Sequence, residues 1–186
     1  MTELWLVRHG QTDWNLEGRY QGQSDVPLNS TGLAQAYTLA EKLDGWIFKA
    51  IYSSDLQRAR QTADVLAVCL GLPVNEDTRL REICQGEWEG MRLSELRQIF
   101  AENLAENEKD PLHARAPGGE STLEVAERVS QAADEIAAAY PDSRVLVISH
   151  GFAIATLICR ARQIPLAEVY AHIPENASYA VVEWGK

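Results

Sequence analysis

Positive charge is scarce in this sequence of 186 residues. Lys and Arg number 17 against 27 Asp and Glu, which gives a formal net charge of -10. Such an acidic balance disfavours general binding to nucleic acid or to an anionic membrane surface. A site that binds anions would therefore have to gather the few cations in one place.

Cysteine is also rare, and its three positions are far apart in the chain. Cys69, Cys84 and Cys159 form no CxxC pair and no Cys/His ligand spacing, so the sequence predicts no metal site. Cys69 and Cys159 lie in apolar runs, and we interpret them as small buried hydrophobic residues. This cysteine usage favours a reduced, cytosolic compartment.

Three further absences narrow the class of protein. No run of about 18 apolar residues occurs, so we expect no membrane span. No basic segment precedes the first apolar run, so we expect no signal peptide and a cytoplasmic location. The loop GxxxxGKS/T, which cradles nucleoside triphosphates, does not occur either.

The composition that remains is that of an ordinary globular protein. Hydrophobic residues make up 46% and charged residues 24% of the chain, so disorder is not expected. The length suits one compact domain, and we predict a single domain over residues 1–186.

Apolar runs alternate with segments of helical periodicity along the whole chain. The patterns predict strands over 4–7, 47–52, 144–149 and 179–184, and helices over 31–43, 53–71, 93–104, 121–140 and 152–162. Strands that alternate with helices favour a parallel sheet covered on both faces. We therefore predict an α/β fold, a three-layer sandwich with a mostly parallel central sheet flanked by helices.

Capping residues support several of these helix boundaries. Ser54 or Asp55 is expected to cap the second helix, and Gly71 to end it. Ser121 and Glu124 form the pattern of a capping box at the start of the fourth helix.

A polar segment broken by two prolines follows the third helix. Residues 106–119 read ENEKDPLHARAPGG and are typical of a loop or lid rather than a domain linker. We predict a small lid over about 93–119. His113 and Arg115 in it could contact a substrate carboxylate or second phosphate, although solvated loop residues are the simpler interpretation.

Two predicted strands end in the same way. LWLVRHG places His9 and Gly10 at the end of the first strand, and VLVISHG places His150 and Gly151 at the end of another. The carboxyl ends of parallel strands share one edge of a sheet, where ligands bind at the switch point of strand order. The glycines would allow backbone to approach a ligand closely, and the free N–H groups of the helix opened by Gly151 would favour an anion.

The same edge should also collect two arginines. Arg8 precedes His9, and Arg58 lies in the first turn of the second predicted helix, facing the crevice, whereas Arg60 lies on another face. Either arginine alone would be interpreted as a solvated side chain. Together with the two histidines they form a cationic cluster that matches the oxygens of a phosphoryl group. Ser53 and Ser54 are interpreted as helix-capping residues.

The sequence resembles the histidine phosphatase superfamily, the phosphoglycerate mutase-like enzymes. The resemblance is carried in order by LVRHGQTDWN, GRYQGQSDVPLNSTGLAQA, IYSSDLQRARQTA, LREICQGEWEG, PGGES and VLVISHG. It covers nearly the whole chain and implies a phosphoglycerate mutase-like fold.

The resemblance also implies roles for individual residues. His9 would be the nucleophile that becomes phosphorylated, and Glu82 the general acid. The residues expected to bind phosphate are Arg8, Asn15, Arg58 and His150, and those expected to bind substrate are Gln21, Gly22 and Gly151. A neutral imidazole is a good nucleophile near pH 7, and nearby arginines disfavour its protonation. Neither a metal nor a cofactor is implied.

The predicted activity is hydrolysis of small phosphorylated metabolites through a phosphohistidine. The alternatives are a phosphoglycerate mutase, an α-ribazole phosphatase and a non-catalytic module that binds phospho-ligands. A mutase must exclude water under a closed lid, whereas this lid is short and carries four acidic residues, Glu102, Glu106, Glu108 and Asp110. Substrate specificity should depend on Gln11, Trp14, Tyr20, Gln21 and the lid around 100–119. We expect the protein to be a monomer or a homodimer.

Overall fold

The computed structural model describes residues 1–185. Five strands are present, β1 (Thr2–Arg8), β2 (Ala50–Ser53), β3 (Val74–Glu76), β4 (Arg144–Ser149) and β5 (Tyr179–Trp184). The α-helices are α1 (Asp13–Glu17), α2 (Ser30–Lys42), α3 (Gln57–Leu70), α4 (Leu93–Ile99), α5 (Ala101–Lys109), α6 (Thr122–Ala139) and α7 (Gly151–Ala161). Short 3-10 helices are η1 (Thr78–Leu80), η2 (Gly86–Trp88) and η3 (Leu166–His172).

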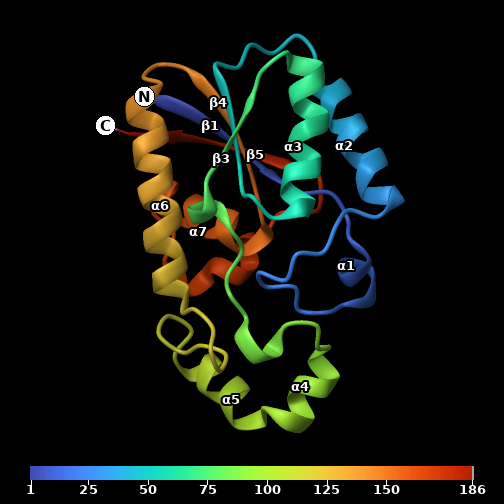
Figure 1. Cartoon of the computed structure of the whole chain (residues 1–186). Coiled ribbons are helices and arrows are strands. Elements are labelled where there is room, and N and C mark those ends of the chain that lie inside the picture. Colours follow the sequence, from blue (N-terminus) through green and yellow to red (C-terminus); the bar gives the residue numbers. More distant parts are fainter. Residues whose placement is uncertain (186) are drawn as a thin grey trace.

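The strands form one sheet in the order β3-β2-β4-β1-β5. β1, β2, β3 and β4 run parallel, and β5 pairs antiparallel with β1. Helices α2 and α3 cover one face of the sheet and α6 and α7 cover the other, while α4 and α5 extend beyond one end of it (Figure 1). The predicted three-layer α/β sandwich is confirmed.

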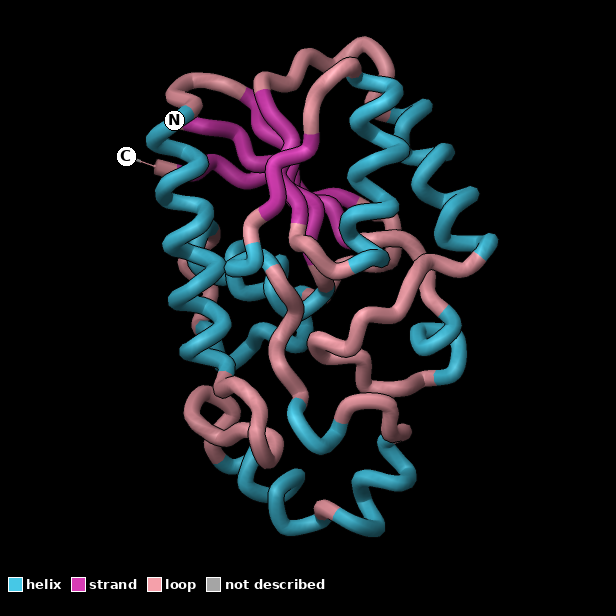
Figure 2. The backbone as a smooth tube through the Cα atoms, viewed as in Figure 1, coloured by secondary structure: helices cyan, strands magenta, loops and turns pink. Residues whose placement is uncertain are grey.

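Side-chain alternation along the central strands explains why the sheet is covered on both faces. In β1, Leu4 and Leu6 pack with α6 and α7, whereas Trp5 and Val7 pack with α2 and α3. Successive strand residues point to opposite faces, so a continuous apolar run buries only when helices cover both sides. Figure 2 shows the two helical layers on either side of the strands.

The crevice that matters for function lies between β1 and β4. The chain leaving β1 continues to α2 on one face, and the chain leaving β4 continues to α7 on the opposite face. Neighbouring strands whose connections diverge in this way leave an opening at their carboxyl ends. Arg8 pairs in register with Ser149, and the His9 N–H donates to the Ser149 carbonyl at 3.1 Å.

Several predicted boundaries need correction. The second strand begins at Ala50 rather than 47, because Ile47 is exposed and pairing with β4 starts only near Lys49. The helix predicted over 93–104 is two helices, α4 and α5, with a break at Phe100. Residues 106–109, predicted as loop, belong to α5, which ends just before Pro111 because the residue preceding a proline disfavours the helical conformation.

The capping predictions have mixed outcomes. Gly71 ends α3 in the left-handed conformation, and the Ser121–Glu124 capping box is present. The predicted cap of α3 by Ser54 or Asp55 is wrong, because the N-cap is Leu56 with no side-chain bond. Ser54 instead bonds to a histidine ring, and the Asp55 carboxylate binds Arg81.

Cys159 is buried as predicted, but the prediction for Cys69 is wrong, because it lies on the exposed side of α3. Within residues 1–185 no helix is both long and apolar enough to cross a membrane.

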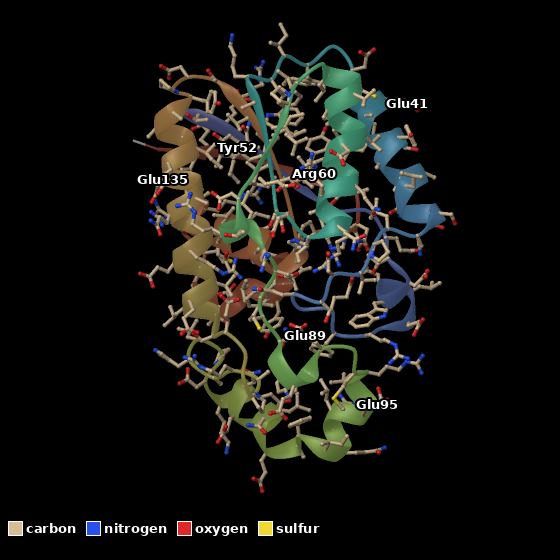
Figure 3. The ribbon with its side chains drawn as sticks, in the orientation of Figure 1. Glu41, Tyr52, Arg60, Glu89, Glu95 and Glu135 are labelled. Carbon is tan, nitrogen blue, oxygen red and sulfur yellow. The ribbon has the colours of Figure 1, made fainter. Side chains whose placement is uncertain are left out.

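The lid segment has a small core of its own. Trp88, Leu96 and Ala116 are buried together beneath α4 and α5. Glu89 ties this region to the loop that follows α1: its carboxylate accepts bonds from the Gln23 N–H at 2.8 Å and the Ser24 hydroxyl at 2.6 Å. Figure 3 shows Glu89 where the lid helices meet the rest of the molecule.

Candidate active site

The two histidines predicted from the strand ends lie side by side. Their ring centroids are 5.1 Å apart, and both residues are almost fully buried. They come from residues 9 and 150, directly after β1 and β4, so the parallel pairing of these strands alone brings them together. The sequence prediction that the two histidines lie within a few ångströms of each other is confirmed.

The His9 ring has one nitrogen committed and one available. Its Nδ1 lies 2.7 Å from the Gly10 carbonyl oxygen. Since a carbonyl only accepts hydrogen bonds, Nδ1 carries the proton and Nε2 keeps its lone pair. Burial, together with the Arg58 and Arg8 guanidinium groups, holds the pKa of His9 well below its usual range. The ring is therefore neutral at pH 7, with an unprotonated Nε2.

The His150 ring has both nitrogens engaged. Arg58 Nε donates to Nδ1 at 3.2 Å, and Nε2 lies 2.8 Å from the Ser54 hydroxyl oxygen. Because Nδ1 accepts, the neutral ring must carry its proton on Nε2 and donate it to Ser54. Burial, followed by the charge of Arg58, lowers the pKa of His150 well below its usual range.

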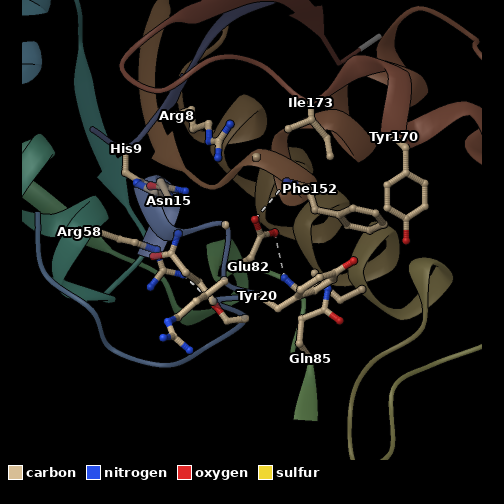
Figure 4. A pocket seen from close by; sticks show the side chains of 16 residues that line it. Arg8, His9, Asn15, Tyr20, Arg58, Glu82, Gln85, Phe152, Tyr170 and Ile173 are labelled. Atoms are coloured by element: carbon tan, nitrogen blue, oxygen red, sulfur yellow. Dashed lines mark hydrogen bonds between the residues drawn. The ribbon is translucent and has the colours of Figure 1, made fainter. Parts of the chain in front are cut away.

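A cavity of about 360 Å³, here called the site cavity, opens beside His9. All the predicted site residues except His150 line it, namely Arg8, His9, Asn15, Gln21, Gly22, Arg58, Glu82 and Gly151. Figure 4 shows His9, Asn15 and Arg58 on one side of Glu82 and Phe152, Ile173 and Tyr170 on the other. His150 lies behind this wall, against Arg58, and is not itself part of the lining.

Three arginines line the cavity, and Arg19 is paired with Glu17 at 2.6 Å. Arg8 and Arg58 have no carboxylate partner in the part of the chain that the structure describes. Arg58 donates to the carbonyls of Ser24 and Gly22, both at 2.7 Å, and Arg8 donates to the Pro174 carbonyl at 2.6 Å. Arg8 Nε is buried with no partner at all among the described residues. Unpaired buried cations are costly, so this wall is built to receive an anion.

Burial lowers the pKa of both arginines. The value for Arg58 falls to about 10, which still leaves the guanidinium charged at pH 7, and the pKa of Arg8 is also lowered. Two fixed positive charges beside an unprotonated imidazole nitrogen suit an incoming phosphoryl group.

Glu82 occupies the N-terminus of α7. One carboxylate oxygen accepts the N–H groups of Ile83 at 3.0 Å and Ala153 at 3.1 Å, and the other accepts the Phe152 N–H at 3.1 Å. The expectation that the first turn of α7 offers free N–H groups to an anion is therefore wrong for Phe152 and Ala153. Their partner is this carboxylate, which satisfies the helix end from within the protein.

Arg128 on α6, which the sequence did not single out, holds the segment that carries Glu82. Its guanidinium donates to the carbonyls of Arg79, Arg81 and Glu82 at 2.7–2.8 Å and to the carboxylate of Glu120 at 2.8 Å. One side chain thus satisfies three carbonyls within residues 79–82. No local pattern near residue 128 signals this role, since the partners are 46 to 49 residues away.

Asn15 and Gln21 are both held through their side-chain oxygens. Asn15 Oδ1 accepts from the Thr12 N–H at 3.0 Å and from Asn176 Nδ2 at 3.3 Å, which assigns its amide nitrogen to the opposite side. Gln21 Oε1 accepts from the Thr12 hydroxyl at 2.8 Å. Each side chain therefore keeps N–H donors for a ligand in the cavity.

The glycines near the site are closely packed against other protein atoms. A Cβ at Gly10 would strike the Gly32 backbone, and one at Gly151 would lie 2.9 Å from Ile173 Cγ2. Gly22 has φ +52° and its carbonyl accepts from Arg58. The close approach predicted at Gly10 is therefore to the backbone of Gly32. The left-handed conformation of Gly22 positions the carbonyl that accepts the hydrogen bond from Arg58.

The lid residues left open by the sequence lie outside the site cavity. His113 is exposed and pairs with Asp110, and Arg115 is exposed and pairs with Glu124. The solvated interpretation of both residues is supported. Of the four acidic lid residues, only Glu108 lines the neighbouring cavity under the lid.

Ser54 is the residue of this site that sequence reasoning missed. It was interpreted as a helix cap, yet it follows β2, the neighbour of β4, and therefore reaches the same sheet edge as His150. The contact between Ser54 and His150 could have been predicted only if the order of the strands in the sheet were already known. Within residues 1–185 no group of three or more His, Cys, Asp or Glu side chains is arranged to hold a metal ion.

The fold and this site together define an α/β protein with a histidine and an arginine clamp at the switch point of its sheet. The chain belongs to the histidine phosphatase superfamily (branch 1), whose family model matches residues 4–186. The family resemblance seen in the sequence is confirmed.

Named relatives include both phosphatases and a mutase. Phosphoserine phosphatase 1 of Hydrogenobacter thermophilus is 34% identical over 182 residues, which cover 98% of this chain and 86% of that protein. A protein named "Probable phosphoglycerate mutase GpmB" of Salmonella choleraesuis is 37% identical over 168 residues, 89% of this chain and 77% of that protein. The solved α-ribazole phosphatase of Shigella flexneri matches with a TM-score of 0.90 at 29% identity, and the match covers 99% of this chain and 91% of that one.

Proposed function

We propose that this protein is a phosphomonoesterase that hydrolyses small phosphorylated metabolites through a phosphohistidine formed on His9. The observation that carries the proposal is the pairing of an unprotonated Nε2 on His9 with the half-buried Arg8 and the buried Arg58, neither of which has a carboxylate partner in the described chain. The phosphatase names among the relatives support the same reaction.

In the first step His9 Nε2 attacks phosphorus as the bond to the ester oxygen breaks. Arg8 and Arg58 balance the charge on the other phosphoryl oxygens, and the Asn15 amide adds an N–H donor. With that charge balanced by arginines, the proposed reaction needs no metal.

Glu82 is the proposed proton donor to the leaving oxygen. Its Oε2 accepts one backbone N–H, whereas Oε1 accepts two, so Oε2 is the oxygen that can carry the proton. In the second step water attacks the phosphohistidine, Glu82 takes a proton from that water, and the nitrogen–phosphorus bond breaks to release phosphate.

His150 remains a proposed phosphate ligand, although it does not line the cavity. While Arg58 donates to its Nδ1, that nitrogen has no proton to offer. A dianionic phosphoryl group would draw Arg58 to itself and favour a protonated His150, which would then donate from Nδ1 to phosphate and from Nε2 to Ser54.

The decisive experiment traps the intermediate. The enzyme is denatured without acid during turnover, and the position of the phosphoryl group is mapped by mass spectrometry. We expect an acid-labile, base-stable adduct on His9. A phosphorylated serine, or the absence of a covalent adduct while product accumulates, would contradict the proposed mechanism.

A phosphoglycerate mutase is the second candidate, because a relative of that name is 37% identical. The argument against it from an acidic lid now rests on Glu108 alone, since the other three carboxylates do not line the cavity. Supplying 3-phosphoglycerate and following both inorganic phosphate and 2-phosphoglycerate separates the two. We expect phosphate release to be faster; faster isomerisation, above all with added bisphosphoglycerate, identifies a mutase.

We further propose that residues 93–119 act as a lid on a single domain. Cytoplasmic location and a monomeric or homodimeric state stay predictions from the sequence.

A further inference from the structure

A second cavity, here called the lid cavity, lies next to the site cavity beneath α4 and α5. It measures about 630 Å³, and Tyr20, Gln85 and Tyr170 line both cavities. The two spaces are therefore adjoining compartments that meet at two tyrosines and a glutamine. A substrate whose phosphoryl group lies beside His9 would extend its alcohol part past these residues.

The junction between the cavities is aromatic. The Tyr20 ring packs against Trp88 with a centroid distance of 6.0 Å, and the Tyr170 ring packs against Phe152 at 5.2 Å, both edge to face. These contacts fix the planes of the two tyrosines. A planar group passing between the compartments would meet aromatic surface at this junction.

The walls of the lid cavity are mainly apolar. Leu93, Leu104, Ala105, Pro111 and Ala167 contribute aliphatic surface to it. A short polar alcohol such as the serine or glycerate part of an ester would leave most of this apolar space filled with water. A larger apolar group would displace that water, which is the main source of binding free energy in such pockets.

We infer that the substrate is a phosphomonoester whose alcohol part carries a ring system or other bulky apolar group that enters the lid cavity. This inference rests on the proposed function, since it places the phosphoryl group beside His9. The small esters phosphoserine and 3-phosphoglycerate are then poor substrates.

Two esters with leaving alcohols of nearly equal acidity provide the test. Ethyl phosphate and 2-(naphthyl)ethyl phosphate differ in the group that would enter the lid cavity and not in the chemistry at phosphorus. We expect kcat/KM for the naphthyl ester to exceed that for ethyl phosphate by at least about tenfold, because even one methylene in an apolar pocket has an effect of this order. Equal kcat/KM values for the two esters would overturn the inference and leave the phosphatase activity established. If neither ester is hydrolysed, the proposed function itself is overturned.

A pair of variants on α5 locates the effect. Ala105 is exposed at the helix surface and lines the cavity, whereas its neighbour Glu106 is exposed and does not. Ala105→Phe should bring the ratio of kcat/KM between the two esters towards one, and Glu106→Phe should keep the ratio of the original protein. A ratio that Ala105→Phe leaves unchanged would overturn the location in the lid cavity.

Discussion

The ends of β1 and β4 have similar sequences, VRHG and ISHG, yet their histidines differ in what their ring nitrogens can do. His9 Nδ1 is hydrogen-bonded to the carbonyl of the next residue, which leaves Nε2 available to a ligand in the cavity. Both nitrogens of His150 are hydrogen-bonded, Nδ1 to Arg58 and Nε2 to Ser54. The chemical difference between the two rings thus comes from their neighbours, because hydrogen-bond partners decide which nitrogen of a neutral imidazole holds the proton.

The helices that follow the two strands differ as well. The cap of α1 is the Thr12 side chain, which belongs to the local sequence. The first turn of α7 is satisfied by Glu82, which is 70 residues away from Phe152 in the chain. The cap of α7 therefore comes from a distant segment, while the cap of α1 is local, and mutations should affect the two helix starts differently.

The largest difference is expected from removing each histidine. His9→Ala should lower kcat by about 10⁴-fold or more, as is usual for loss of a nucleophile, and no phosphoenzyme should form. His150→Ala should lower kcat by about 10²–10³-fold and still form a phosphoenzyme. Steady-state rates and phosphoenzyme trapping measure this, with circular dichroism as the folding control. Equal losses, or phosphoenzyme in His9→Ala, would remove the distinction.

Replacing Glu82 tests the distant partner of the β4 end. Glu82→Gln should reduce turnover of alkyl esters by about 10²–10⁴-fold, because the leaving oxygen then lacks a proton donor. The loss should shrink for 4-nitrophenyl phosphate, whose leaving group needs little protonation. Since the amide also weakens the cap of α7, urea unfolding serves as control. The same loss on both kinds of ester would exclude Glu82 as the acid.

The two buried histidines should also make stability depend on pH. Both have a pKa well below the ordinary 6.5 in the folded state, so below pH 6.5 the unfolded chain binds more protons and folding stability falls with falling pH. Each histidine contributes up to about 1.4 kcal/mol for each pH unit below 6.5, until its folded pKa is reached. Urea unfolding between pH 7 and 5.5 measures the slope.

Single variants apportion that slope between the two strand ends. His9→Asn and His150→Asn should each make the pH dependence shallower, because each variant lacks one of the two buried imidazoles. The carboxylates that titrate in the same range are common to all three proteins and therefore do not affect the comparison. A slope that neither variant changes would mean that the histidines are not held neutral by the fold.

The smallest expected effect comes from Ser54→Ala. His150 Nε2 would lose its acceptor, and the loss of one hydrogen bond of about 1 kcal/mol should lower kcat about fivefold. Ser53→Ala is the matched control, because the Ser53 hydroxyl bonds to the Ser54 carbonyl and does not touch the ring. Nitrogen-15 NMR of the imidazole should show a changed His150 Nε2 resonance in Ser54→Ala alone. An equal loss in both variants would give Ser54 no special role.

Most of the architecture could be predicted from the sequence, because it depends on local patterns. The apolar runs of β1 and β4, the periodicity of α2 and α6 and the Ser121–Glu124 capping box are all visible in short windows. The break at Phe100 and the exposed side of α3 at Cys69 were not, because they depend on how the lid and the helices pack.

By itself the sequence determined the order of the strands and helices other than β3 and α1, and the placement of Arg8, His9 and His150 at strand ends, because side-chain periodicity and strand termination depend on local sequence. Only the tertiary structure decided that His150 donates to Ser54, that Glu82 caps α7 and that a second cavity adjoins the first. Those contacts join segments 70 to 96 residues apart. They depend on distances set by sheet order and helix packing, which no local pattern of residues specifies.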